Sequence, residues 1–272
     1  LGAAMALDFN SMGPIGLLGA GRMGGALIEG WARAGAIDPA DLIIIEPHPS
    51  PNIQALGARL NPPPAALDQI RTLLLAVKPQ VWKAAAADVA PHLASDAVIV
   101  SIAAGVALAD IAAAFGGRRV ARVMPTTAVC IGKGVASIYA PDPEPHARAH
   151  ALFAPVATTV DLAHESLMHA ATAVSGSAPA YLYAFIEALE GAGAKAGLSE
   201  KAARRLARAT IAGAGALLEA SGEEPAELRR QVTSPGGTTQ AALEVLMGQG
   251  GLGDLLERAV GAAVRRSQDL GG

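Results

Sequence analysis

The chain has 272 residues, long enough for two domains of ordinary size, and 51% of them are hydrophobic while only 3% are aromatic. No apolar run reaches the roughly 18 residues of a membrane span, so a mean hydropathy of +0.35 indicates extensive burial, compatible with a buried subunit interface. The net charge of −3 and the lack of a Lys/Arg block argue against a nucleic-acid-binding or membrane-binding surface.

The cellular compartment is indicated by two further features. A single cysteine, Cys130, excludes an internal disulfide and fits a reducing environment. The first residues lack the basic segment and long apolar core of a signal peptide. We therefore expect a loosely ordered leader before about Gly13 and a cytoplasmic location.

The first part of the chain alternates short aliphatic runs with helical segments. Helices are expected from the first glycine cluster to about Ala34, over Val81–Val89 and over Leu108–Ala114, whereas Asp142–Pro145 is expected to be an exposed loop. Aliphatic strands that alternate with helices predict a mostly parallel sheet covered on both faces. The expected strands are Ile15–Leu18, Leu42–Ile45, Ala58–Leu60, Thr72–Val77, Ala97–Ile102, Arg119–Met124, Gly134–Tyr139 and Thr158–Leu162.

After about Ala163 no further strand-like run occurs. Ser177 can cap a helix that has Pro179 in its first turn, and Ser199 can cap another that ends before Gly222. The sequence therefore predicts an α/β domain at residues 13–162 followed by an all-helical domain at residues 163–272. The expected helices run through 181–196 and from 199 to about 220, and then over 226–232, 239–247 and 252–267.

A glycine motif, Gly19-x-Gly21-x-x-Gly24, directly follows the first strand and opens a helix, and Glu46 ends the second strand 22 residues later. This context matches the Rossmann-type dinucleotide fingerprint, which needs a tight turn, backbone close to the pyrophosphate, a helix N-terminus and a carboxylate for the ribose. A glycine turn that serves only helix packing is the alternative. The candidate cofactor residues here are Gly19, Gly21, Arg22, Met23, Gly24 and Glu46.

The choice between NAD and NADP stays open. The Glu46 carboxylate favours NAD(H), because it would bond the ribose 2′-hydroxyl and repel a 2′-phosphate. His48 and Ser50 lie just beyond it and could bind that phosphate.

Further cofactor contacts are expected from other strand ends. The carboxyl edge of a doubly wound sheet faces the cofactor crevice, so residues there could contact the ribose or nicotinamide. For Lys78, a solvated lysine ahead of a helix-initiating proline is an equally good interpretation. The candidates are Asn61, Ala76, Val77, Lys78, Pro79 and Met124.

No metal site is expected from the histidines. His146 and His150 have i,i+4 spacing, but they lie in or near the proline-rich stretch and have no evident third ligand.

A loop reading QVTSPGGTTQ, Gln231–Gln240, lies between two predicted helices of the second domain. Pro235 stops a helix, and Gly236–Gly237 lets the backbone approach a ligand closely. Thr238 and Thr239 supply hydroxyls at the next helix N-terminus, where free N–H groups favour an anion. By itself this is most simply an ordinary helix–loop–helix turn. Placed after a dinucleotide domain, as the densest polar cluster of an otherwise aliphatic half, it becomes the candidate substrate site.

Several separated segments, in matching order, resemble the pyrroline-5-carboxylate reductase family over residues 15–267. The pattern differs at Thr126, Ala128 and Ala178, where the family usually has Asn, Pro and Gly, and the first two put the family's asparagine contact near the nicotinamide in doubt. The segments are LGAGRMGGALIEGW (18–31), AVKPQ (76–80), RVMPTTAVCIGKG (122–134), AVSGSAPAYLYAFIEALEGAGAKAGL (173–198) and VTSPGGTTQAAL (232–243).

The resemblance implies a Rossmann-type domain followed by a helical dimerisation domain, in homodimers that often assemble into decamers. It implies hydride transfer from NADPH or NADH to the C5=N imine of 1-pyrroline-5-carboxylate, giving L-proline, at a site between the cofactor edge of one subunit and helical residues of its partner. Thr239 is the expected catalytic residue, at the ring nitrogen. Expected substrate-binding residues are Ser177, Ser234, Gly236, Gly237 and Thr238.

Two other functions remain open on the sequence alone. One is a related dinucleotide-dependent reductase of another imine or of a small keto or hydroxy acid. The other is a protein that senses the dinucleotide without turnover, against which the intact SPGGTT loop counts.

Overall fold

The computed structural model describes residues 12–270, so the expected leader lies outside the described residues apart from Met12, which is buried in the core. The described chain divides into two compact units. Residues 177–263 form the helical unit. The other described residues, 12–176 and 264–270, form the sheet unit.

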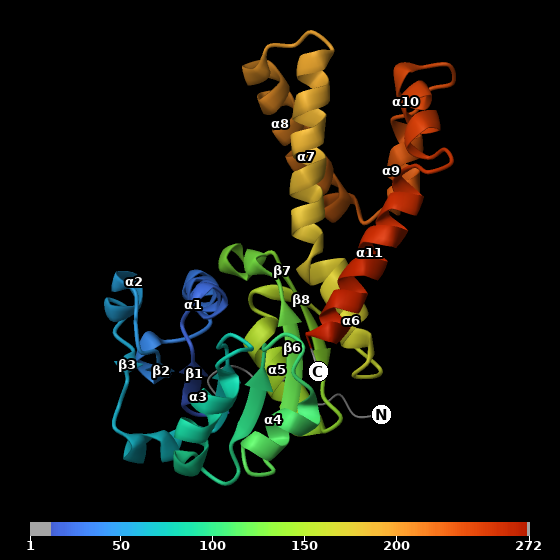
Figure 1. The fold of residues 1–272 in the computed structure, drawn as a ribbon. Coiled ribbons are helices and arrows are strands. Elements are labelled where there is room, and N and C mark those ends of the chain that lie inside the picture. Colours follow the sequence, from blue (N-terminus) through green and yellow to red (C-terminus); the bar gives the residue numbers. More distant parts are fainter. Residues whose placement is uncertain (1–11, 271–272) are drawn as a thin grey trace. The chain divides into compact units, whose positions relative to one another are not determined.

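The sheet unit contains eight strands, all of which were expected from the sequence, with ends that differ by one or two residues (Figure 1). Strands β1 to β6 run parallel to their neighbours, β7 is antiparallel to β6, and β8 is parallel to β7. Their order across the sheet is β3-β2-β1-β4-β5-β6-β7-β8. The strands are β1 Ile15–Leu18, β2 Leu42–Ile45, β3 Arg59–Leu60, β4 Thr72–Leu75, β5 Val98–Ser101, β6 Val120–Pro125, β7 Gly134–Tyr139 and β8 Ala157–Asp161.

Helices cover both faces of this sheet because its central strands are apolar on both sides. On one face α1 (Arg22–Ala34) and α5 (Pro143–Phe153) pack over one hydrophobic cluster. On the other face α3 (Trp82–Val89) and α4 (Leu108–Ala114) cover a second cluster. A short helix, α2 (Pro51–Gln54), follows β2.

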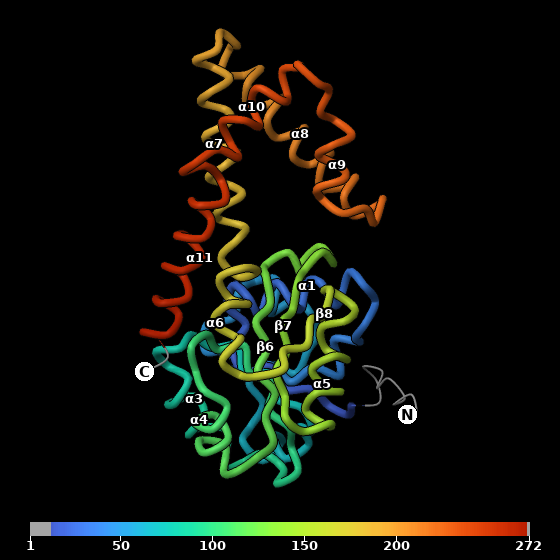
Figure 2. The backbone as a smooth tube through the Cα atoms, turned by 90° about the vertical axis from the view of Figure 1, so that its right-hand side faces the viewer, coloured from blue at the N-terminus to red at the C-terminus, as the bar shows by residue number. Residues whose placement is uncertain are grey.

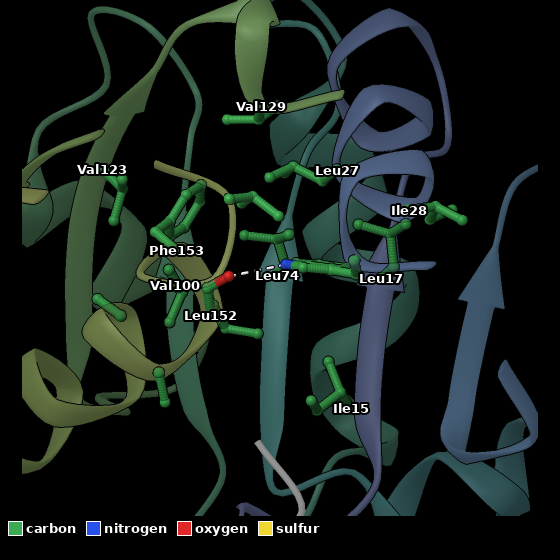
Figure 3. Close-up of a cluster of buried hydrophobic side chains, with 14 of the residues drawn as sticks. Ile15, Leu17, Leu27, Ile28, Leu74, Val100, Val123, Val129, Leu152 and Phe153 are labelled. Atoms are coloured by element: carbon green, nitrogen blue, oxygen red, sulfur yellow. Dashed lines mark hydrogen bonds between the residues drawn. The ribbon is translucent and has the colours of Figure 1, made fainter. Parts of the chain in front are cut away.

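The first cluster is held by packing and by one buried hydrogen bond. Leu27 and Ile28 of α1 belong to the same buried cluster as Leu17 of β1 (Figure 3). The fully buried Trp31 donates its Nε1–H to the carbonyl oxygen of Leu152 at 2.7 Å, which ties α1 to α5. The two covering helices of this face are therefore fixed to each other as well as to the sheet.

The expectation of an exposed loop at Asp142–Pro145 was wrong. Asp142 is the N-cap of α5, Pro143 is its first residue, and Pro145 is buried within the first turn. The first N–H groups of a helix have no intrahelical partner, so prolines there cost no hydrogen bond. The proline cluster is therefore the beginning of a helix.

After β8 the chain is entirely helical, as expected. Helix α6 (Leu167–Ala171) and a π-helix at Thr172–Gly176 still belong to the sheet unit. Of the expected caps, Ser199 accepts a hydrogen bond from the Ala202 N–H, while Ser177 makes no side-chain cap bond. The remaining helices are α7 Ala178–Lys195, α8 Glu200–Ser221, α9 Pro225–Gln231, α10 Thr238–Leu246 and α11 Leu252–Asp269.

Within the helical unit, α7 and α8 pack side by side. Only Ala203 and Ala207 of these two helices are buried, while large apolar side chains such as Leu182, Tyr183 and Phe185 are exposed. Across the described residues, no helix combines the length and apolar character needed to cross a membrane.

Candidate active site

The carboxyl ends of three parallel strands meet at one edge of the sheet. In the pairing register Leu18 of β1 lies opposite Ile45 of β2 and Leu75 of β4. The Gly19 N–H donates to the Ile45 carbonyl at 2.9 Å, and the Ala76 N–H donates to the Leu18 carbonyl at 2.8 Å. The residues that follow these strands are thereby held at fixed positions along the same edge.

The three motif glycines have different structural roles. Gly19 has φ +98°, and a Cβ there would lie 2.9 Å from the Ala76 backbone, so the tight turn requires glycine. A Cβ on Gly24 would lie 2.3 Å from the Gly19 carbonyl oxygen, so this glycine permits close helix–strand packing. A Cβ on Gly21 would meet no atom within 4 Å. Gly21 therefore leaves open space at the N-terminus of α1, which is the place for a pyrophosphate.

Helix α1 offers further support for an anion at this point. Its N-cap, Gly21, makes no side-chain cap bond, and its first turn contains no acidic residue. The free N–H groups and the positive end of the helix dipole therefore face an uncapped space. These residues fit a dinucleotide.

Glu46 connects the second strand to the glycine turn. One carboxylate oxygen accepts from the Ala20 N–H at 2.9 Å, and the other accepts from the His48 N–H at 3.0 Å. A carboxylate has about four acceptor positions, so each oxygen can still accept a ribose hydroxyl. The Glu46 carboxylate thus lies beside the glycine motif, where the sequence predicted it. Its two hydrogen bonds also hold the turn in shape, a role that the sequence did not indicate.

Asn61 positions Glu46. Its side-chain oxygen accepts from the Glu46 N–H and its amide donates to the Glu46 carbonyl, both at 2.9 Å. Its φ of 45° is the one left-handed value at a non-glycine residue in the described chain, and asparagine tolerates that conformation better than most residues. Both amide atoms are therefore already bonded to the protein. A direct cofactor contact by Asn61 stays a prediction.

A pocket of about 910 Å³ lies along the flank of α1. It is large enough for a nucleotide half of a cofactor. Among its lining residues are Gly21, Glu46, His48, Ser50 and Cys130. The Glu46 carboxylate and the His48–Ser50 pair therefore face one cavity. These are the two features that bear on the choice between NAD and NADP.

The other expected cofactor residues lie along the same edge. Ala76 and Val77 follow β4 and are half-buried, while Lys78 and Pro79 are exposed. Among the described residues Lys78 has no ion-pair or hydrogen-bond partner for its side chain, which leaves its ammonium available. Met124 is almost fully buried on β6.

Thr126, which stands where the family usually has asparagine, is used by the fold. Its hydroxyl accepts from the Val135 N–H at 3.0 Å, and its own N–H donates to the Val135 carbonyl at 2.9 Å. The side chain is buried and connects the end of β6 to the start of β7. Transfer of the family's asparagine contact to this position therefore lacks structural support.

The predicted substrate loop joins α9 to α10. Gly236 has φ +70°, which only glycine adopts readily, and Gly237 is the N-cap of α10 without a side-chain cap bond. In the described chain the N–H groups of Thr238 and Thr239 donate to no protein acceptor. Two free donors at a helix N-terminus make an anion site that suits a carboxylate.

Gln240 was missed by the sequence reasoning. Its side-chain oxygen accepts from the Gly236 N–H at 2.8 Å, and the Gly237 N–H donates to the Ser234 carbonyl at 3.0 Å. Its bond resembles the back-bond of a capping box but is made to the residue before the N-cap. The donors free to hold a substrate are thus the first N–H groups of α10, beginning at Thr238, and not those of Gly236 and Gly237.

Ser177 lies at the beginning of α7, apart in sequence from the loop. No described hydrogen bond joins its hydroxyl to the loop residues. The assigned roles of Ser177, Ser234 and Thr239 stay predictions.

The parallel sheet, the glycine turn and the helical second unit define a dinucleotide-dependent oxidoreductase whose second domain is helical. A family model described as pyrroline-5-carboxylate reductase dimerisation matches residues 165–270, and one described as NADP oxidoreductase, coenzyme F420-dependent, matches residues 14–105.

Similar proteins cover almost the whole chain. A pyrroline-5-carboxylate reductase of Synechocystis is 38% identical over 94% of this chain and 98% of its own. The structure of one from Coxiella burnetii has a TM-score of 0.87 at 27% identity, covering 96% of this chain and 99% of that one. A Plasmodium falciparum enzyme solved with NADP bound has a TM-score of 0.81 at 26% identity, covering 96% and 98%. The chain belongs to the pyrroline-5-carboxylate reductase family.

Proposed function

We propose that this chain reduces 1-pyrroline-5-carboxylate to L-proline with NADPH or NADH, the last step of proline synthesis. The observation that carries the proposal is the pair of complementary sites in one chain. The sheet unit has an uncapped helix N-terminus beside the Glu46 carboxylate, and the helical unit has a second uncapped N-terminus suited to a small carboxylate.

A reduced nicotinamide cofactor held at the glycine turn and beside Glu46 would supply the hydride that C5 of the imine accepts. The protonated imine is already an electrophile, so the protein has mainly to position it and exclude water. The free N–H groups of Thr238 and Thr239 hold the substrate carboxylate through charge-assisted hydrogen bonds. The Thr239 hydroxyl hydrogen-bonds the ring nitrogen, whose protonation state decides the electrophilicity of C5.

Thr239→Ala tests this assignment. We expect kcat/KM for pyrroline-5-carboxylate to fall about 10-fold or more, while the dissociation constant of the cofactor is unchanged, because the ring nitrogen loses one positioned hydrogen-bond partner. Thr239→Ser should recover most of the activity, since it keeps the hydroxyl.

The same loop offers a matched control. Thr233 donates its hydroxyl to the Arg229 carbonyl at 2.6 Å, so its side chain is already satisfied within the protein. We expect Thr233→Ala to change kcat/KM by less than about 3-fold, a difference below 1 kcal/mol. Normal turnover by Thr239→Ala would refute the role of that hydroxyl. Cofactor binding by the unmodified protein with no proline formed would refute the reductase activity itself.

We also propose that two copies of the chain form a homodimer through the helical unit. Helices α7, α9 and α10 contain no buried residue, yet they carry exposed Leu182, Phe185 and Val245. Apolar helix faces of this extent favour burial against another subunit. Decamer formation, a cytoplasmic location and the domain division at 162/163 are retained as parts of the same proposal.

A further inference from the structure

Two histidines and an aspartate converge on the outer edge of the sheet unit, away from the cofactor pocket. His146 and His150 lie one turn apart on α5, and Asp161 is the last residue of β8, which is the edge strand of the sheet. Helix α5 and strand β8 lie side by side (Figure 2). The expectation placed these histidines in or near a proline-rich loop with no evident third ligand, whereas both lie on α5 and have Asp161 as a candidate third ligand.

The geometry of the three side chains is that of a chelating group. Both imidazole Nε2 atoms approach the same carboxylate oxygen, Oδ1 of Asp161, at 3.0 Å from His146 and 2.8 Å from His150. The ring centroids are 4.5 Å apart, and the candidate ligand atoms all lie within 4.8 Å of one another. Two imidazole nitrogens and a carboxylate oxygen thus surround one point, each offering one lone pair when Nε2 is unprotonated.

We propose that His146, His150 and Asp161 form a binding site for a late first-row divalent transition metal, with Zn²⁺ the best-fitting ion. Imidazole with carboxylate is a donor set that suits Zn²⁺, Ni²⁺ and Cu²⁺, whereas Mg²⁺ and Ca²⁺ prefer oxygen alone. Histidines at i and i+4 of a helix present their rings on one face, a spacing that recurs in zinc sites.

Binding needs an adjustment of all three side chains, because the two Nε2 atoms, which lie within 4.8 Å of each other, must also come to about 3.4 Å apart. Ligand atoms about 2.0–2.2 Å from a tetrahedral ion lie about 3.4 Å apart. The present N–O separations of 2.8 and 3.0 Å therefore have to widen by about half an ångström. The Asp161 side chain is 55% exposed and can make that movement, and the partly exposed rings leave an open path for the ion.

The three side chains come from two different elements, His146 and His150 from α5 and Asp161 from β8. A bound ion would join α5 to β8 and so protect the exposed sheet edge.

The test uses the full-length protein with any affinity tag removed, titrated with Zn²⁺ against a chromophoric chelator and, separately, with Ni²⁺ and Mg²⁺. We expect Zn²⁺ and Ni²⁺ to occupy this site at one ion per chain, and no Mg²⁺ binding. His146→Ala, His150→Ala and Asp161→Asn should each weaken Zn²⁺ binding at least about 10-fold. Zn²⁺ should raise the Tm of the unmodified protein and not that of His150→Ala.

His92→Ala is the matched control, because His92 is an exposed histidine elsewhere in the sheet unit. It should bind Zn²⁺ like the unmodified protein. If an alanine variant unfolds, His146→Gln and His150→Gln keep a side-chain hydrogen-bond donor and serve in its place. Absence of one-to-one binding, or equal affinity in all variants, would overturn the proposal. Reductase kcat should be unchanged in every variant, since none of these residues lines the cofactor pocket.

Discussion

Replacing two glycines of the fingerprint one at a time separates cofactor binding from folding. Gly21 and Gly24 belong to the same short motif. A methyl group added at Gly21 would meet no atom within 4 Å, whereas one added at Gly24 would lie 2.3 Å from the Gly19 carbonyl oxygen. Gly21→Ala should therefore affect the ligand, and Gly24→Ala should affect the fold.

The magnitudes follow from these distances. Ordinary contact begins at 3.4 Å, so at Gly24 the backbone must move by about 1 Å. Overpacking of this kind costs about 1–3 kcal/mol, offset by at most about 1 kcal/mol of helix propensity. We expect Gly24→Ala to lose about 2 kcal/mol, which lowers the Tm by roughly 4–8 °C. Gly21→Ala should stay within about 0.5 kcal/mol of the unmodified protein.

The assays are thermal unfolding without ligand and a fluorescence titration with NADPH and NADH. Gly21→Ala should keep its Tm and lose at least about 10-fold in affinity for both cofactors, because the methyl group occupies the place of the pyrophosphate. Unchanged affinity in Gly21→Ala would refute the approach of the cofactor to this backbone. An unchanged Tm in Gly24→Ala would refute the packing argument, whatever happens to binding.

Three further changes test other contacts of the sheet unit. Glu46→Gln should raise the kcat/KM ratio of NADPH to NADH about 10-fold, because repulsion of the 2′-phosphate is removed; an unchanged ratio would place that phosphate elsewhere. Trp31→Phe should lower the free energy of unfolding by about 1–3 kcal/mol in urea titrations, because the Leu152 carbonyl loses its buried donor; a loss under 0.5 kcal/mol would contradict this. Glu165 accepts from the Arg122 guanidinium at 2.6 Å and from the Leu108 N–H at 2.7 Å. Glu165→Ala should cost about 3 kcal/mol by the same measurement, because Arg122 is left buried and unpaired; a stable variant would show that solvent replaces the partner.

Most of the secondary structure could be predicted because its signals are local. Aliphatic runs bounded by turn residues gave all eight strands, and the capping residues Ser199 and Gly222 gave the limits of α8. The beginning of α5 was missed because prolines usually interrupt helices. In the first turn of a helix, however, prolines are tolerated, and Pro143 and Pro145 lie there.

The contacts that join distant segments could not be read from the sequence. The partners of Glu46 at Ala20 and Asn61 require strands β1, β2 and β3 to lie in register. Asp161 becomes a neighbour of His146 and His150 only because β8 returns beside α5. Residue type and spacing do not predict such long-range contacts, because they do not determine which strands become neighbours in the sheet.

The candidate cofactor site and the predicted substrate loop therefore depend on different parts of the sequence. The cofactor site is held by bonds across the sheet, where Gly19, Ala20 and Ala76 each bond a residue of another strand or its end. The substrate loop is held by bonds within about four residues, as between Gly236 and Gln240. A short motif can therefore specify the substrate loop almost completely, whereas the fingerprint specifies only the turn. Substitutions remote in sequence can then alter cofactor preference through Glu46, while the substrate loop responds mainly to changes within itself.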